Sequence, residues 1–265
     1  MIGVIACVKR EERYIREWLD YHISIGVDRF YLADNNDRDY EPCLKDIVKD
    51  YANVTVIDCM GMSPVQPMCY NTIMERYGNE CEWYAMIDID EFISVKDIKA
   101  FLGQFGNADM IYLHWLNYGD NGLIHYEDKP VQERFVKPYG KHQYIKTIFR
   151  NKSVIESHIH EPFVITDQHC AMEHDYLIRK DCLGNIYIKR EVGYGLPYRE
   201  EEFATAYIRH YITKTLEEYM DIKANRGGAC SKKEKYNLKY FFAYNEVTEE
   251  KKRLLNDKYQ IVWKD

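Results

Sequence analysis

Two aspartates separated by one residue, Asp88 and Asp90, form the pattern with the clearest chemistry in this sequence. Such a pair arises easily by chance among 43 acidic residues, but this one directly follows Trp83–Ile87, an apolar run typical of a buried strand. Residues i and i+2 of an extended segment point to the same side, so both carboxylates face one ligand. Two such oxygen ligands suit Mg²⁺ or Mn²⁺ bridging a diphosphate. Glu91 points the other way and is interpreted as a cap or an ion-pair partner beneath the site.

A second pair with the same spacing, His158 and His160, places two imidazoles on one face, where a neutral ring nitrogen is able to ligate a metal. For His158, packing or surface exposure is an equal alternative. His210 precedes Lys214 where a helix is expected to begin, so that backbone amides and the lysine would hold a phosphate. The alternative there is a capping turn with a solvated lysine.

Two carboxylates are candidates for a general base. Asp120 lies in the turn 119–122, and a carboxylate within reach of a sugar hydroxyl can remove its proton, although the same composition is typical of a plain turn. Glu133 lies next to Arg134, and the alternative for it is a structural ion pair with that arginine. Both alternatives stay open on the residues alone.

The elements that position these residues alternate between strand and helix. Apolar and amphipathic patterns predict strands over 2–8, 29–33, 54–57 and 83–87, and helices over 11–25, 41–51 and 68–77. This alternation predicts βαβ units and a parallel sheet covered on both faces. Ligands of such sheets bind beyond the carboxyl ends of the strands. We therefore expect Lys9, Arg10, Asp34, Asp88 and Asp90 to share one crevice.

The pattern becomes less regular from about residue 109. Strands are predicted over 110–115, 142–150 and 154–155, and helices over 200–209 and 213–225. A charged, tyrosine-rich segment over 231–259 is also expected to be helical. We draw soft boundaries inside one compact unit, with parts 1–108, 109–230 and a C-terminal extension 231–265.

Composition and charge exclude several classes of protein. The chain has 265 residues with 36 Lys and Arg against 43 Asp and Glu, and the resulting net charge of −7 disfavours a dedicated nucleic-acid binder. No apolar run is long enough to cross a bilayer, and Met1–Lys9 reads as a strand rather than a leader. The eight cysteines include no Cys-x-x-Cys pair, as expected for reduced thiols in a cytoplasmic protein.

Taken in order, these segments resemble GT-A-fold glycosyltransferases of the family 2-like type that merges with family 92. The resemblance covers about residues 7–228 and is specific because many short motifs occur in register. They are Glu11-Glu12-Arg-Tyr14 with Glu17-Trp-Leu19, Tyr21-His22, Gly26-Val-Asp28, Tyr31-Leu-Ala-Asp-Asn35, Trp83 to Ile93 as the DxD strand, Trp115 to Gly122 as a Trp…Phe-Gly-x-x-Gly loop, Glu133-Arg-Phe135, Lys146-Thr-Ile148, His160-Glu-Pro162, and His210 to Gly227.

The resemblance implies an α/β fold with a GT-A-type, Rossmann-like, mostly parallel sheet flanked by helices. Residues 1–108 would then bind the nucleotide sugar and 109–230 the acceptor. The implied activity is that of a metal-dependent hexosyltransferase that moves a sugar, with inversion, from a nucleotide-diphosphate donor such as a UDP-sugar. The implied acceptor is a hydroxyl of a glycan or lipid-linked saccharide in cell-surface polysaccharide synthesis.

The resemblance also assigns roles to single residues. Asp90 would bind Mn²⁺ or Mg²⁺, Asp88 the metal or its water and the ribose, and His160 the metal and diphosphate. The remaining donor contacts would come from Val8, Lys9, Arg10, Asp34, Lys146, His210 and Lys214. Asp120 stands where relatives often carry Ser or Thr, a departure that places Glu133 ahead of it as the base.

Two alternative functions and one candidate membrane contact accompany this hypothesis. A nucleotidyltransferase would need a glycine-rich phosphate loop after the first strand, and Cys7–Glu12 contains no glycine. A non-catalytic nucleotide- or carbohydrate-binding module would have no functioning metal site. The run Lys232–Lys235, with the tyrosines and phenylalanines that follow, suits a peripheral contact with the inner face of a membrane, although a solvated helix face is the favoured interpretation.

Overall fold

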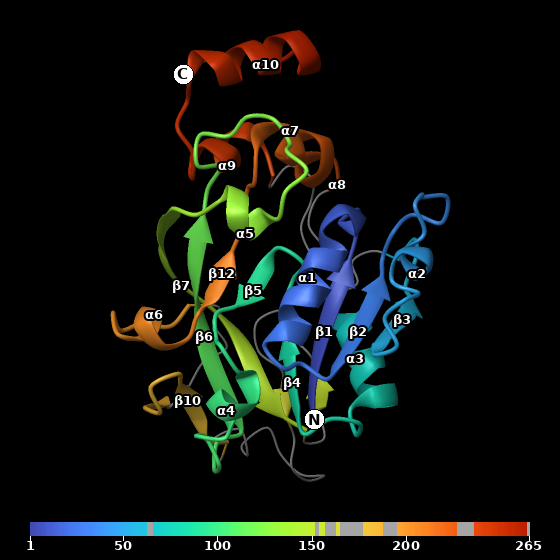
Figure 1. Ribbon diagram of the computed structural model, residues 1–265, viewed down its shortest axis with the longest axis vertical. Coiled ribbons are helices and arrows are strands. Elements are labelled where there is room, and N and C mark those ends of the chain that lie inside the picture. The colour runs from blue at the N-terminus through green and yellow to red at the C-terminus, as the bar shows by residue number, and fades with distance from the viewer. Residues whose placement is uncertain are drawn as a thin grey trace. The chain divides into compact units, whose positions relative to one another are not determined.

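The structure is a computed structural model that describes residues 1–62, 66–151, 154–156, 163–164, 177–187, 195–226 and 236–263 (Figure 1). In 154–156 and 163–164 only the strand backbone is described. The chain forms two compact units. The first contains Met1–Leu116 and Lys141–His210, and the second contains Asn117–Gly140 and Tyr211–Asp265. The predicted boundary at 108 therefore falls inside the first unit, and residues 211–226 belong to the same unit as the described part of the C-terminal extension.

The first unit is built on a parallel sheet whose strands run in the order β3-β2-β1-β4. These strands are rich in β-branched and aromatic residues, and β1, β4 and all of β2 except Arg29 are buried. Their bounds are β1 Ile2–Val8, β2 Arg29–Asp34, β3 Val54–Asp58 and β4 Trp83–Met86. All four strands predicted for this half are confirmed within one residue at either end.

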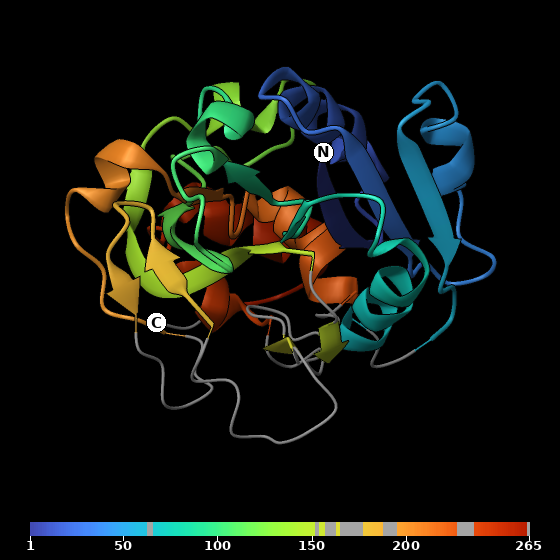
Figure 2. The same cartoon turned by 90° about the horizontal axis from the view of Figure 1, so that it is seen from below.

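Helices α1 (Glu12–Ser24) and α3 (Gln66–Tyr77) cover opposite faces of this sheet, as Figure 2 shows. Trp18 of α1 packs its ring edge against Phe30 of β2, with ring centroids 5.7 Å apart. On the other face Tyr70 and Ile73 of α3 join a buried cluster with Tyr31. Side chains alternate along β2, so Phe30 packs against α1 on one face of the sheet and Tyr31 packs against α3 on the other.

The helix predicted over 41–51 is much shorter in the structure, where α2 spans only Leu44–Ile47. Pro42 has no N–H to donate, and it restricts Glu41 to extended conformations, so the helix begins after both. The C-cap, Val48, is β-branched and adopts a non-helical conformation.

The second half of the sheet mixes strand directions. β7 (Pro138–Arg150) lies antiparallel to β4, and β6 (Met110–Tyr118) is its other neighbour. The α/β class is confirmed, with parallel strands in the first half and both directions in the second. The remaining elements of this unit are β5 Glu91–Ile93, α4 Ile98–Leu102, β8 Val154–Glu156, β9 Phe163–Val164, β10 Arg179–Asp181, β11 Ile186–Tyr187, α6 Glu202–Thr205 and β12 Ile208–His210.

The helix predicted over 200–209 is wrong in its second half. Only α6 is helical, and Ala206 then turns to an extended conformation that leads into β12. β12 pairs antiparallel with β5, with His210 opposite Glu91. Pairing with a distant strand outweighs the local helix preference here. The consequence for function is that His210 is brought beside the segment that contains Asp90.

The second unit is mostly helical around a small core of Leu216, Tyr219, Phe241 and Leu255. Arg134 and Glu218 form a buried bidentate ion pair within it, at 2.8 and 2.9 Å. Its helices are α5 Val131–Arg134, α7 Leu216–Glu218, a π-helical turn Tyr219–Lys223, α8 Ala224–Arg226, α9 Leu238–Phe242 and α10 Glu249–Tyr259. Across the described ranges, no helix combines the length and apolar character needed to span a membrane.

Candidate functional site

Asp88 and Asp90 lie where the chain leaves the carboxyl end of β4. A tight turn holds them there, in which the backbone N–H of Asp88 donates to Glu91 Oε2 at 2.9 Å and that of Glu91 donates to the Asp88 carbonyl at 3.0 Å. The turn leads directly into β5, which is buried at every residue. The motif is therefore set by a strand on each side rather than by a free loop.

The Asp88 carboxylate is fixed at both oxygens. Lys146 Nζ lies 2.8 Å from Oδ2, and Gln66 Nε2 donates to Oδ1 at 2.6 Å. The lysine side chain is 1% exposed, whereas that of Asp88 is 32% exposed. A carboxylate that is oriented from below and still reaches solvent is suited to receive a ligand from above.

Glu91 is fully buried beneath Asp88 and Lys146, and Lys146 Nζ lies 3.1 Å from Glu91 Oε2. Burial raises the pKa of Glu91 well above its usual range, and the nearby charges of Asp88 and Asp90 raise it further against the opposing effect of Lys146. Burial alone would lower the pKa of Lys146, but the carboxylates of Asp88 and Glu91 raise it above its ordinary value. The lysine therefore stays charged beneath the acidic motif, and Glu91 is both the cap and the ion-pair partner expected from the sequence.

Asp90 faces His210, whose Nε2 lies 3.8 Å from Asp90 Oδ1. Both side chains are nearly buried, at 7% exposure each. Two ligands of a small divalent ion, each about 2.1 Å from it, stand at most about 4.2 Å apart, so one ion can bind both atoms. Within the described residues no cluster of three or more His, Cys, Asp or Glu side chains is arranged around a metal position. This donor set fits Mg²⁺ or Mn²⁺, which are commonly held by one or two carboxylates with substrate phosphates completing the shell.

A second group of candidates lies at the ends of β1 and β2, where Val8 pairs with Asp34. The Asp34 carboxylate is 1% exposed and accepts the backbone N–H of Asn36 at 3.1 Å and its Nδ2 at 2.9 Å, both at Oδ1. Burial raises the pKa of Asp34. Its Oδ2 is buried with no hydrogen-bond partner among the described residues. A ligand that donates to this oxygen would remove the cost of burying it unpaired.

Lys9 and Arg10 leave β1 and turn toward Asp37. Their side-chain nitrogens lie 3.7 and 2.9 Å from its carboxylate oxygens. Arg10 has a left-handed backbone, φ +54°, and its N–H donates to Asn36 Oδ1 at 2.7 Å. The two cations therefore order the loop after β2, and Val8, Lys9, Arg10 and Asp34 lie together as expected.

Asp120, Glu133 and Lys214 lie in the second unit. Asp120 is only 4% exposed, with Lys251 Nζ 2.5 Å from its Oδ2 in an ion pair that lacks hydrogen-bond alignment. Its N–H donates to Asn245 Oδ1 at 2.6 Å, and its Oδ1 accepts the N–H of Gly122 at 2.8 Å. A Cβ on Gly119 would lie 2.6 Å from the Tyr244 carbonyl oxygen. The C-terminal segment thus encloses the 119–122 turn.

Glu133 is exposed on α5, and Arg134 pairs with Glu218 rather than with it. The structural ion pair considered for Glu133 is therefore made by another carboxylate. Lys214 is 7% exposed and left-handed, φ +57°, directly before Thr215, which caps α7 in a reciprocal capping box with Glu218. His158, His160 and the run Lys232–Lys235 lie outside the described residues.

Two residues of the site were not singled out from the sequence. Gln66 fell before the predicted start of its helix, and Asn36 was grouped in a turn. Gln66 donates a hydrogen bond to Asp88 from a distant segment, and Asn36 donates one to Asp34 from the neighbouring turn. The sequence signal for Asn36 was its place directly after a strand that ends in aspartate; for Gln66 we find none.

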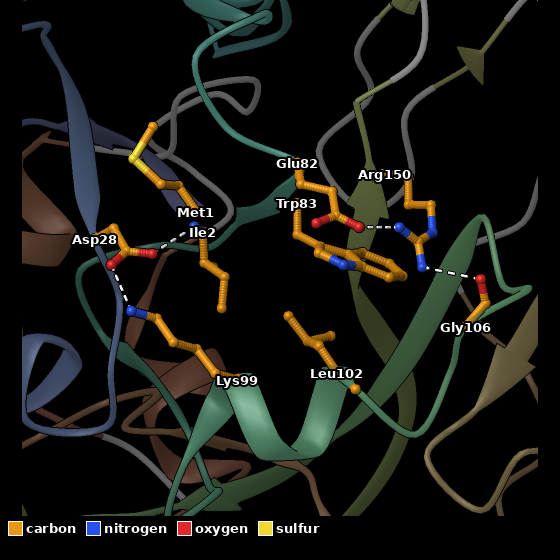
Figure 3. A pocket seen from close by; sticks show the side chains of 10 residues that line it. Met1, Ile2, Asp28, Glu82, Trp83, Lys99, Leu102, Gly106 and Arg150 are labelled. Atoms are coloured by element: carbon orange, nitrogen blue, oxygen red, sulfur yellow. Dashed lines mark hydrogen bonds and ion pairs between the residues drawn. The ribbon is translucent and has the colours of Figure 1, made fainter.

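A hollow of about 360 Å³ lies at the opposite end of the strands, lined by residues that begin β1 and β4 (Figure 3). Its charges are paired among themselves, Lys99 with Asp28 at 2.6 Å and Arg150 with Glu82. Ile2 and Leu102 point into the space between these pairs. Because the acidic motif lies at the carboxyl ends of the strands, this hollow is separate from the candidate site.

Comparison with known proteins gives a family match over nearly the whole chain. The model of Glycosyltransferase family 92 matches residues 3–251. A family 92 protein of Oryza sativa subsp. japonica is 35% identical over 91 residues, which are 34% of this chain and 15% of the relative. One of Ricinus communis is 24% identical over 130 residues, 46% of this chain and 23% of the relative. The matched segments are thus less than a third of the length of these relatives.

Solved structures overlap with the chain more loosely. HddC from Yersinia pseudotuberculosis has a TM-score of 0.41 at 12% identity, covering 68% of this chain and 89% of that one. TarS of S. aureus, in a complex with UDP-GlcNAc, has a TM-score of 0.40 at 17% identity, covering 73% of this chain and 60% of that one.

Proposed function

The chain belongs to glycosyltransferase family 92, and from this premise we propose that it transfers a sugar from a nucleotide-diphosphate donor, a UDP-sugar, to a hydroxyl of a glycan or lipid-linked saccharide. The observation that carries the proposal is the fixed acidic motif at the end of β4, where Asp88 is held by Lys146 and Gln66 while one edge stays open. We place the reaction in the cytoplasm, in the synthesis of a cell-surface polysaccharide.

The donor nucleoside is assigned to the ends of β1 and β2. Among the described residues Asp34 Oδ2 has no hydrogen-bond partner, and this supports the assignment because a nucleobase N–H or a ribose hydroxyl would satisfy it. Val8, Lys9 and Arg10 supply the neighbouring backbone, which the Asp37 ion pairs and the Asn36 hydrogen bond hold in place. A rigid loop here lowers the entropy lost when the donor binds.

The diphosphate is assigned to the acidic motif. Asp90 and His210 would hold Mn²⁺ or Mg²⁺, with Asp88 reaching the ion, its water or the ribose; His160 and Lys214 remain further candidates. The bound ion would supply Lewis-acid stabilisation of the departing phosphate charge. Lys146 acts from below, where its contacts with Asp88 and Glu91 keep the motif ordered before the donor arrives.

The acceptor hydroxyl needs a base if the reaction inverts the anomeric carbon. We assign this to Glu133, whose carboxylate is exposed because Arg134 pairs elsewhere. Asp120 is the weaker candidate, since its oxygens are occupied by Lys251 and by the N–H of Gly122. Glu133 takes the hydroxyl proton as the new glycosidic bond forms and the nucleoside diphosphate leaves.

The test is a thermal-shift panel of UDP, GDP, CDP and their sugars, each with Mn²⁺ or with EDTA. A ligand at 100 times its dissociation constant stabilises the folded state by about 2.7 kcal/mol. We expect a shift with one nucleotide that requires Mn²⁺ and is lost in Asp90→Asn. The matched control is Asp50→Asn, a surface aspartate whose contact with Arg16 is long, at 3.4 Å.

The panel tests the metal assignment and the donor assignment separately. An equal shift with Mn²⁺ and with EDTA would overturn the metal assignment and leave the donor site standing. No shift with any nucleotide would overturn the donor proposal and favour a carbohydrate-binding module. Release of nucleoside diphosphate from the sugar donor that shifts, lost in Asp90→Asn and kept in Asp50→Asn, would establish turnover.

A further inference from the structure

Four aromatic side chains lie side by side on three neighbouring strands of the first unit. Trp115 is on the middle strand, β6, with its ring centroid 4.2 Å from that of His210 on β12. On its other side β7 contributes Tyr144 and His142, whose centroids lie 5.3 and 6.0 Å from that of Trp115. The two β7 rings are 4.5 Å apart and nearly perpendicular. We call these four residues the aromatic wall.

The wall is joined to the acidic motif at both ends. His142, Tyr144 and Lys146 alternate along β7, so they project from the same face of the strand. Lys146 holds Asp88 at 2.8 Å, and at the other end His210 lies 3.8 Å from Asp90. The wall and the two aspartates therefore form one continuous surface.

The register of β7 against β4 sets where the wall stands. Ala85 pairs with Ile148 in an antiparallel ladder, which brings Lys146 level with the first residue after β4. Each further pair of residues advances about 6.6 Å. Tyr144 and His142 thus stand roughly 7 and 13 Å beyond Lys146 along β7, past the carboxyl end of β4, where ligands of such sheets bind.

Exposure divides the wall into a backing and an open part. Trp115 is 9% and His210 6% exposed, whereas Tyr144 and His142 are half-buried. Burial lowers the pKa of His142, so its ring is neutral near pH 7. Its Nδ1 accepts the backbone N–H of Tyr144 at 3.1 Å, which places the ring hydrogen on Nε2 and makes that nitrogen a donor.

These properties match the surface of a pyranose ring. Such a ring presents C–H groups on one face and hydroxyls around its edge, and flat aromatic side chains with a polar tip contact both. We propose that the open part of the aromatic wall binds a pyranose ring of the acceptor, with its C–H face against Tyr144 and a hydroxyl accepting from His142 Nε2. This inference rests on the proposed function and adds to it the residues that bind the acceptor saccharide.

The acceptor, rather than the donor sugar, is chosen on position. A donor sugar is bonded to the diphosphate and so stays beside Asp88 and Asp90. Tyr144 and His142 stand one and two residue pairs farther along β7 than the lysine that contacts Asp88. A ring stacked there would hold its acceptor chain at the edge of the reaction centre.

The experiment has a binding arm and a kinetic arm. Saturation-transfer NMR with methyl glucoside, galactoside, mannoside and N-acetylglucosaminide measures binding without turnover. With p-nitrophenyl glycosides of the same sugars as acceptors, the kinetic arm measures the KM of acceptor and donor separately. The variants are Tyr144→Ala, Tyr144→Phe and His142→Ala, with Gln143→Ala as the control because its side chain projects from the opposite face of β7.

We expect Tyr144→Ala to raise the acceptor KM by on the order of tenfold with less than about a twofold change in donor KM, and Tyr144→Phe to restore most of the loss. Saturation of one glycoside should fall in parallel, and Gln143→Ala should behave as wild type. Unchanged acceptor KM in both Tyr144→Ala and His142→Ala, or no saturation of any glycoside by wild type, would overturn the inference. A glycoside that binds through Tyr144 in a protein without transferase activity would instead overturn the proposed function alone.

Discussion

Two lysine–aspartate pairs show how the same chemical contact serves different purposes in the two units. Lys146 pairs with Asp88 at 2.8 Å in the first unit, and Lys251 pairs with Asp120 at 2.5 Å in the second. Both lysine side chains are 1% exposed. The aspartates differ, since the side chain of Asp88 is 32% exposed and that of Asp120 only 5%.

The two pairs differ in the side from which the lysine approaches the carboxylate. Lys146 approaches Asp88 from the protein interior and leaves an open edge for a ligand. Lys251 and Asn245 come from the C-terminal segment and close over the Asp120 turn. We conclude that the solvent-exposed edge of its carboxylate makes Asp88 a better candidate for ligand binding than Asp120.

The largest effect expected from this comparison concerns the base. Glu133→Gln should lower kcat by about 10²–10⁴, because a positioned base contributes that much to proton removal. Asp120→Asn should change the kcat of the folded enzyme by less than about tenfold, since its carboxylate is already occupied. Steady-state transfer assays normalised to folded protein measure both, with the surface variant Glu127→Gln as control. A larger loss in Asp120→Asn than in Glu133→Gln would reverse the assignment.

The buried ion pair of Lys251 and Asp120 should contribute mainly to stability. Lys251→Met leaves the buried Asp120 without its cation, and we expect a loss of about 3–5 kcal/mol in the free energy of unfolding. Urea denaturation followed by circular dichroism measures it. The double variant Asp120→Asn/Lys251→Met removes both charges and should recover part of the loss. A single variant as stable as wild type would show that the pair contributes little.

The contrast also explains what the sequence was able to predict. The strands of the first unit were predictable because their apolar runs are local signals, and the residues at their ends followed from the geometry of parallel sheets. Glu91 was correctly interpreted as a cap and an ion-pair partner, although residues 88–91 form a tight turn and not the extended segment that the interpretation assumed. In each case the deciding information lies within a few residues.

Predictions failed where a distant segment decides the local structure. β12 is a strand because it pairs with β5 across more than a hundred residues, and Arg134 bonds Glu218, 84 residues away, instead of its neighbour. Asp120 does lie in a turn, but nothing in the sequence indicated that Lys251, more than a hundred residues away, pairs with its carboxylate. Pairings of this separation depend on the whole fold and leave no periodic signal in one sequence.

The ion pair of Lys146 and the partly exposed Asp88 should contribute to turnover rather than to folding stability. Asp88→Asn keeps the shape of the side chain and one oxygen for Lys146 or Gln66, so we expect the free energy of unfolding to change little. It removes a charge at the donor site, and kcat/KM should fall by about 10²–10³. Transfer kinetics beside urea denaturation, with Asp50→Asn as control, test both halves. A variant that unfolds easily but turns over normally would place Asp88 in the same category as Asp120.

The smallest effect concerns the support beneath the open site, where His22 of α1 is fully buried against β5. Its Nδ1 lies 2.8 Å from the Trp18 carbonyl oxygen, and its Nε2 accepts the N–H of Ile93 at 3.3 Å. Burial lowers the pKa of His22 to about 3, so the ring is neutral when folded and takes up a proton only on unfolding. The unfolded state therefore gains stability as the pH falls below about 6.5.

Between pH 7.5 and 5.5 this one group should lower the free energy of unfolding by about 1.4 kcal/mol. Glu91 acts in the opposite direction, because burial raises its folded pKa and its contribution improves as the pH falls. The two are separated by comparing wild type with His22→Phe, which cannot titrate at this position, in urea denaturation at each pH. The difference between their stabilities should shrink toward acid by that amount. A constant difference across the range would mean that His22 is protonated inside the fold and that the support under β5 is charged.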